Sequence, residues 1–129
     1  MKYLVDTDWV IDYLKGQKRA TEMLASLSSD GVAISLISYG EIYEGIFFGK
    51  DPKRHEKDFL KFLRWVPVLF LTKPIMKQCI RMRGSLRQSG QLISDFDLLI
   101  AATAIHHRLT LLTHNKRHFH RISALKLYQ

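Results

Sequence analysis

Short, mostly apolar runs alternate along the chain with segments in which apolar residues recur every three or four positions. The runs have the length of strands and lack the alternation of a half-exposed sheet, which is typical of strands buried on both faces. They span residues 3–5, 32–35, 66–71, 109–113 and 124–128. The helical spacing predicts helices over residues 8–16, 19–31, 38–50, 51–65, 73–88 and 94–107. This alternation predicts an α/β fold: a central, mostly parallel five-stranded sheet flanked by helices on both faces.

Local signals mark the ends of some of the predicted helices. Asp8 is placed to cap the first helix and Gly16 to end it. Pro52 stands in the first turn of the helix over 51–65, a position that proline favours. The apolar residues that we expect this helix to turn inward are Phe59, Leu60, Phe62 and Leu63.

The composition is that of a globular protein, with 47% hydrophobic and 25% charged residues among 129. This length predicts a single domain over residues 1–129. No uncharged stretch approaches the roughly 18 residues of a membrane span, and the few apolar residues before Asp6 are too short for a secretory signal. A single cysteine, Cys79, cannot form an internal disulfide. We therefore expect a cytoplasmic protein that does not contact a membrane.

Basic residues outnumber acidic ones, 20 Lys and Arg against 12 Asp and Glu, for a formal net charge of +8. A surface of this charge attracts polyanions such as nucleic acids, or it serves solubility alone. Candidates for phosphate contacts lie on the helix over 73–88 and just after the fourth predicted strand. They are Lys77, Arg81, Arg83, Arg87, Lys116, Arg117 and Arg121. The segment over 116–121 ranks first because it lies nearer the acidic residues.

Several acidic residues fall where the predicted strands end or the following helices begin. Asp6 ends the first strand, and Glu41 lies in the opening turn of the helix after the second. Ligands of open parallel sheets bind beyond the carboxyl ends of the strands, so residues far apart in sequence should meet at one edge. The other polar residues expected at this edge are Asp95, Asp97, Thr113 and Asn115.

Most of these acids also have a purely structural interpretation. Glu41 and Asp97 each stand three residues after a serine, as in a capping box, and Asp95 suits the positive end of a helix dipole. Asp6 has a weaker structural explanation, because a carboxylate directly after a buried strand is costly unless it is paired or bound. If the acids only capped helices, several independent coincidences would be needed to place them all at the same end of the sheet.

Clustered carboxylates repel one another, and a hard divalent cation such as Mg²⁺ or Mn²⁺ commonly relieves that repulsion. Such ions activate water and stabilise the attacking and leaving oxygens of a phosphodiester displacement. An acidic centre within a basic surface therefore suggests a metal-dependent nuclease.

Four stretches, "LVDTD", "YGEIYEG", "DFDLLIAATAI" and "LLTHNKRHF", resemble in order and spacing the four sequence blocks of PIN-domain ribonucleases. The resemblance runs from residue 3 to about residue 121 and is closest to the VapC-type toxins of type II toxin–antitoxin pairs. It implies a PIN-like domain and a Mg²⁺- or Mn²⁺-dependent endoribonuclease that cleaves RNA, with a cognate antitoxin as partner and a homodimer as the assembly.

The resemblance assigns catalytic and metal-binding roles to Asp6, Glu41 and Asp97, which fall on the three most regular acids of the family. It implies a water polarised by metal on Asp6 and Asp97, with Glu41 completing the ligand set or accepting the proton. In-line attack by this water would leave 5′-phosphate and 3′-hydroxyl ends.

The fourth acidic position of the family falls on Asn115, which brings no charge. The resemblance therefore allows either one or two bound metal ions. Asp95 can supply part of the missing charge as a further ligand. The resemblance gives Thr113 the role of orienting water or an acid, and Asp8 a capping or orienting role beside Asp6.

The helix after residue 38 carries two apolar stripes. Ile42 and Ile46 form one, while Tyr39, Tyr43 and Phe47 form the other. One stripe faces the core, and the other is either a second core contact or an exposed groove that receives a helix of the antitoxin.

Two other functions also fit parts of the sequence. "DTDWV" after an apolar strand matches the pattern of haloacid-dehalogenase phosphatases, in which Asp6 would be the nucleophile. A non-catalytic RNA-binding module would use the basic surface while the acids only cap helices. The histidines of the last third of the chain match no compact zinc-binding spacing.

Overall fold

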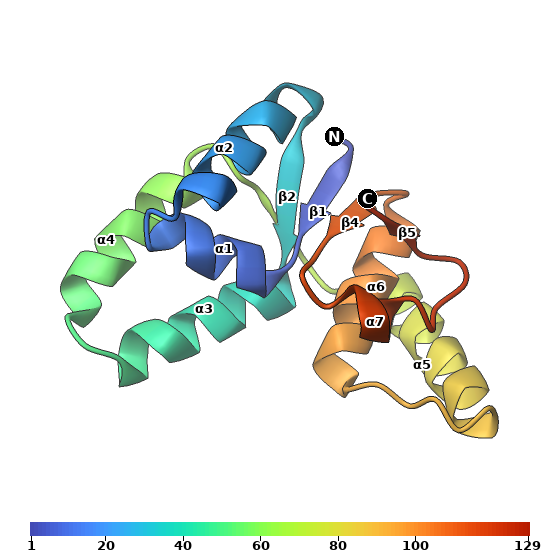
Figure 1. Ribbon diagram of the computed structural model, residues 1–129. Coiled ribbons are helices and arrows are strands. Elements are labelled where there is room, and N and C mark those ends of the chain that lie inside the picture. The colour runs from blue at the N-terminus through green and yellow to red at the C-terminus, as the bar shows by residue number, and fades with distance from the viewer.

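Five short strands form one sheet, in the order β3-β2-β1-β4-β5, in the computed structural model, which describes residues 1–129 (Figure 1). All neighbouring strands pair in parallel, which confirms the predicted sheet. The strands are β1 (Tyr3–Val5), β2 (Val32–Ser35), β3 (Val68–Leu69), β4 (Thr110–Leu112) and β5 (Lys126–Leu127). The order reverses direction between β1 and β4, and open α/β sheets bind their ligands at such a switch point.

Helices cover both faces of the sheet, with α1 to α4 on one side and α5 to α7 on the other (Figure 1). They are α1 (Thr7–Leu14), α2 (Lys18–Leu27), α3 (Leu36–Phe48), α4 (Pro52–Leu63), α5 (Lys73–Gln88), α6 (Asp95–His106) and α7 (Lys116–Phe119). None of them combines the length and the hydrophobicity that crossing a bilayer requires.

The two-residue period of the strands divides the core into two parts. Leu4 and Leu111 point to the side of α5 and α6, whereas Val5 and Leu112 point to the side of α1 to α4. The central strands β1 and β4 therefore bury both of their faces, which explains why apolar residues run through them without alternation. The helix α6 is buried on most sides, as its apolar sequence predicts.

The predicted strands are longer than the observed ones. The third was expected over 66–71, but β3 contains only two residues. Before them, Pro67 has no N–H to donate and contributes only its carbonyl, to Ile34; after them, the partner strand β2 has ended at Ser35, opposite Leu69. The fourth and fifth also lose residues at their ends. The short α7 was not predicted, because four residues are too few to show a helical period.

Two of the expected helix caps are wrong. The N-cap of α1 is Asp6 rather than Asp8, which lies in the first turn. The N-cap of α3 is Ser35, whose Oγ accepts from the N–H of Ser38, so this helix begins earlier than expected. The cap of α6 is Ser94, as predicted, and it accepts from the N–H of Asp97 at 3.2 Å.

The helix α4 turns Phe59 and Phe62 inward, but Leu60 is 51% exposed, against the prediction. Phe59 contacts the rings of Tyr39 and Tyr43, with centroids 5.8 and 5.5 Å apart. The aromatic stripe of α3 is therefore a second core contact, closed by α4, and it leaves no open groove at these two tyrosines. Its third member, Phe47, is 65% exposed.

We expect Phe59→Ala to lower the free energy of unfolding by about 3–5 kcal/mol, since it removes a fully buried ring from between α3 and α4. Leu60→Ala on the same helix is the matched control and should cost less than about 1 kcal/mol. Urea unfolding followed by circular dichroism measures both. Equal losses would contradict the observed orientation of α4.

Candidate active site

Asp6 stands at the switch point of the sheet, between the end of β1 and the start of α1 (Figure 1). Its backbone N–H donates to the carbonyl of Leu112 at 2.9 Å, which ties the ends of β1 and β4 together. The side chain is only 6% exposed. One carboxylate oxygen accepts from the N–H of Thr7 at 2.8 Å, and the other accepts from the hydroxyl of Thr113 at 2.6 Å.

Glu41 reaches the same edge from α3 and is linked to Asp6 through Thr7. The hydroxyl of Thr7 lies 2.6 Å from Oε1 of Glu41 and 2.8 Å from Oγ of Ser38. Because a hydroxyl has one proton, Thr7 donates to the carboxylate and accepts from the serine. Thr7 is not among the residues predicted for the site, and Ser38 was expected only as a helix cap. The only sequence signal for Thr7 is its place between the two acids of "DTD".

Asp97 approaches from the opposite layer, in the first turn of α6, and its carboxylate is bound by no hydrogen bond or ion pair. Its charge is close enough to contribute to the titration of Asp6. Burial is the largest cause that raises the pKa of Asp6, and the charges of Asp8 and Asp97 add to it. The hydrogen bonds from Thr113 and Thr7 act in the opposite direction, and the resulting pKa is about 7.

Asp8 joins α1 to the loop after β4. One of its carboxylate oxygens accepts from the N–H of Trp9 at 2.7 Å, and the other accepts from the N–H of His114 at 3.0 Å. Burial raises the pKa of Asp8, while its contacts with His114 lower it. These bonds agree with an orienting role for Asp8, although it is not the helix cap.

Asp95 points elsewhere. It forms an ion pair with Nε of Arg83 at 3.2 Å, between α6 and α5, and its side chain is 68% exposed. This pairing already balances its charge, so Asp95 is not brought together with the other acids as a further ligand. The side-chain amide of Asn115 likewise contacts Nδ1 of His118, at 3.0 Å.

The expected basic residues differ in how free they are to bind phosphate. Arg117 is exposed in α7, directly beyond the acidic edge, and Lys116 is half-buried beside it. The guanidinium of Arg121 donates to the carbonyl of Leu92, in the segment before α6, at 3.0 Å. Arg87 is exposed near the end of α5.

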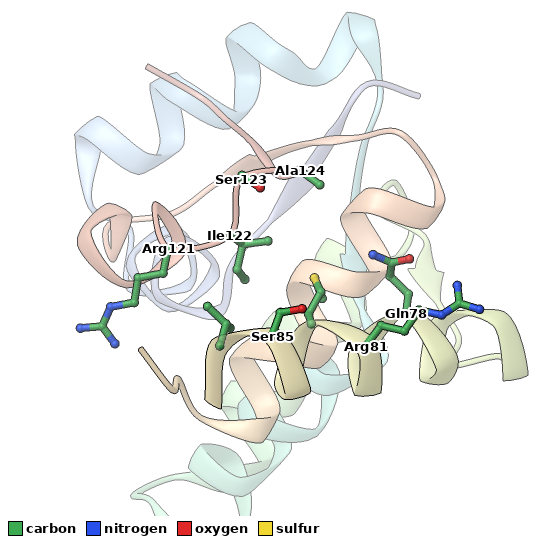
Figure 2. A pocket seen from close by; sticks show the side chains of 9 residues that line it. Gln78, Arg81, Ser85, Arg121, Ile122, Ser123 and Ala124 are labelled. Atoms are coloured by element: carbon green, nitrogen blue, oxygen red, sulfur yellow. The ribbon is translucent and has the colours of Figure 1, made fainter. Parts of the chain in front are cut away.

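A cavity of about 240 Å³ lies between α5 and residues 121–124. Figure 2 shows Arg81 and Arg121 at opposite ends of it, with their guanidinium groups directed away from each other. Because these two cationic groups do not converge, the cavity is not built to bind an anion. No acidic residue lines it either, so it is separate from the acidic edge.

The carboxylates at the edge have the chemistry of a Mg²⁺ or Mn²⁺ site, because all the donors are hard oxygens and the buried charge of Asp6 is uncompensated. They do not yet converge on one point: no three His, Cys, Asp or Glu side chains lie close enough together to hold a metal ion. Thr7 occupies only Oε1 of Glu41, and the carboxylate of Asp97 accepts no hydrogen bond, so oxygens of both residues are available to a cation.

Comparison with known proteins agrees with this arrangement. Residues 3–125 match the family model "PIN domain". The chain is 36% identical over 129 residues to Ribonuclease VapC1 of Methanocaldococcus jannaschii, covering 98% of this chain and 87% of that protein. It is 34% identical over 119 residues to Ribonuclease VapC19 of Mycobacterium tuberculosis, covering 90% of each.

Among solved structures, the VapBC2 complex of Rickettsia felis bound to a DNA fragment from its promoter contains a chain that superposes with a TM-score of 0.93. The match covers 99% of this chain and 98% of that chain at 28% identity. The fold and the site thus define a PIN domain, and the chain belongs to the VapC family of PIN-domain proteins. The family inferred from the four sequence blocks is confirmed, and a haloacid-dehalogenase phosphatase is excluded.

The raised pKa of Asp6 predicts how the stability of the metal-free protein changes with pH. Between pH 3.8 and about 7 the folded chain holds a proton on Asp6 that the unfolded chain has released, so stability falls as pH rises through this window. Asp6→Asn removes the ionisation and should therefore stabilise the protein at pH 8 in EDTA by up to about 4 kcal/mol, but not at pH 4. Urea unfolding at both pH values measures the difference; a gain at pH 4 equal to that at pH 8 would contradict it.

Proposed function

We propose that this chain is an endoribonuclease that hydrolyses phosphodiester bonds in RNA and acts as the toxin of a toxin–antitoxin pair. The observation that carries the proposal is the burial of the Asp6 carboxylate at the switch point of the sheet, where its pKa is raised. Glu41 and Asp97 lie at the same edge, and no Lys or Arg is paired to any of the three. Curated relatives of this chain are named ribonucleases, which supports the same reaction.

Mg²⁺ or Mn²⁺ bound by Asp6 and Asp97, with Glu41 as the third ligand, would supply an activated water and stabilise the leaving oxygen. The protein groups hold this constellation in place. Thr113 orients Asp6 through its 2.6 Å hydrogen bond, and Thr7 orients Glu41. If Glu41 is not the third ligand, it would accept the proton of the attacking water as the water oxygen bonds to phosphorus. The bond between phosphorus and the 3′ oxygen then breaks, and the 3′ oxygen takes a proton from solvent water.

The RNA would lie across this edge with its phosphates toward α7. Arg117 and Lys116 follow β4 by a few residues, close in sequence to Thr113, which contacts Asp6. Arg87 extends the basic surface along α5, and Arg121 donates to Leu92 through one nitrogen only, which leaves its other N–H groups for a phosphate. The net charge of +8 favours RNA at long range.

The partner proposed for this chain is a cognate antitoxin, since the R. felis chain that it resembles belongs to a VapBC complex. A helix of the antitoxin would contact the end of α3, where Phe47 and Phe48 are 65% and 87% exposed. We propose a homodimer as the assembly and the cytoplasm as the place of action, where RNA and the antitoxin are found together.

Asp97→Asn should lower kcat/KM for RNA cleavage by about 100-fold or more, since the loss of a metal ligand exceeds the 10- to 100-fold effect of residues that only orient one. Asp95→Asn, two residues away on the same helix, is the matched control and should cleave at nearly the wild-type rate. Single-turnover cleavage of a labelled RNA measures both. Equal losses in the two variants would refute the assignment of Asp97.

We expect EDTA to abolish cleavage and added Mg²⁺ or Mn²⁺ to restore it, with products that carry 5′-phosphate and 3′-hydroxyl ends. Gel analysis of end-labelled products before and after phosphatase treatment identifies these ends. Cleavage that continues in EDTA, or products with 2′,3′-cyclic phosphates, would exclude the metal-dependent mechanism. Binding of RNA with no cleavage under any metal condition would favour the non-catalytic module instead.

A further inference from the structure

A stacked aromatic pair stands beside the acidic edge and has no part in the chemistry proposed above. The imidazole of His114 lies on the indole of Trp9, with ring centroids 4.4 Å apart and an angle of 20° between the planes. Trp9 is buried in α1, whereas His114 follows β4 and its side chain is 40% exposed. Because Trp9 covers one face of the imidazole, the opposite face is the one open to solvent.

The imidazole is held in place from several directions. Its Nε2 lies 3.0 Å from Oδ2 of Asp12, one turn beyond Asp8 on α1. Its own backbone N–H donates to Asp8 at 3.0 Å. Because these contacts already fix the ring, it can bind a ligand with little further entropy cost.

Trp9 supports this ring at some cost to the fold. Its indole N–H is buried and has no hydrogen-bond partner. The guanidinium of Arg19 lies over the same indole, 5.5 Å from the ring centroid. The Trp9 indole is therefore held by its contacts with His114 and Arg19 rather than by a hydrogen bond, and it supports the imidazole from one side.

We propose that the exposed face of His114 is a stacking surface for one unpaired base of the RNA, next to the phosphodiester that is cleaved. This inference rests on the proposed function, since it takes RNA as the substrate. Bases of single-stranded RNA stack on aromatic and histidine side chains, and each stack contributes to affinity for any base. Thr113, the preceding residue, bonds to Asp6, and Lys116 follows two residues later. The phosphates next to a nucleotide whose base is stacked on His114 would therefore lie between the acids and the basic residues of α7.

The first test compares His114→Ala with His114→Phe, which keeps a flat ring but loses the bond to Asp12. On a single-stranded RNA that the wild type cleaves, His114→Ala should raise KM about ten-fold with little change in kcat, as expected for the loss of one base stack. His114→Phe should stay within about three-fold of the wild type. His120→Ala, which removes another exposed histidine nearby, is the matched control and should leave KM unchanged.

A substrate with a single abasic ribose separates stacking from a role in holding the loop. The abasic site is placed in turn on each side of the cleaved bond. At the position that faces His114, it should raise the wild-type KM about ten-fold and remove the difference between wild type and His114→Ala. The wild-type measurement needs no variant, so it stands even if a substitution disturbs folding.

Two results would overturn the inference. If His114→Ala impairs intact and abasic substrates by the same factor, the histidine only holds the loop. If no abasic position changes the wild-type KM, no base is stacked there. In either case the wild type still cleaves RNA, so the proposed function survives; a wild type that cleaves no RNA would instead end both.

Discussion

The carboxylate of Asp6 is buried at the carboxyl ends of the paired strands β1 and β4, and its surroundings on balance oppose a charge there. Two donors, the N–H of Thr7 and the hydroxyl of Thr113, reach its oxygens, yet burial outweighs them and leaves the pKa at about 7. An uncompensated carboxylate weakens the fold near neutral pH. A bound cation would compensate this charge and offset its energetic cost.

The topology explains how acids from distant parts of the chain reach Asp6. The strand order turns back between β1 and β4, so the crevice at their carboxyl ends is left open to ligands. Glu41 enters from α3 on one face of the sheet, and Asp97 enters from α6 on the other. The layers on both faces therefore have to pack correctly before the site exists, which couples the core to the chemistry.

The alternation of apolar runs and helical segments was enough to predict the parallel sheet, whereas the family was inferred from the resemblance of four sequence blocks. The acids Asp6, Glu41 and Asp97 were found because strand ends in a parallel sheet share one edge. Contacts between elements were harder to predict. Asp95 was suggested only as a possible further ligand, and it pairs with Arg83 from α5. The cap of α1 is Asp6 rather than Asp8, whose carboxylate is instead bound by the N–H of His114, far along the chain.

The sequence by itself determined which residues are buried in strands and which chemical groups stand at their ends, because hydrophobic period and residue type are local properties. The tertiary structure alone decided how those groups are joined. Thr7 bridges Asp6 to Glu41, and His114 lies on Trp9, only because α1, α3 and the end of β4 pack side by side. Such contacts depend on the relative placement of whole elements, which no short stretch of sequence encodes.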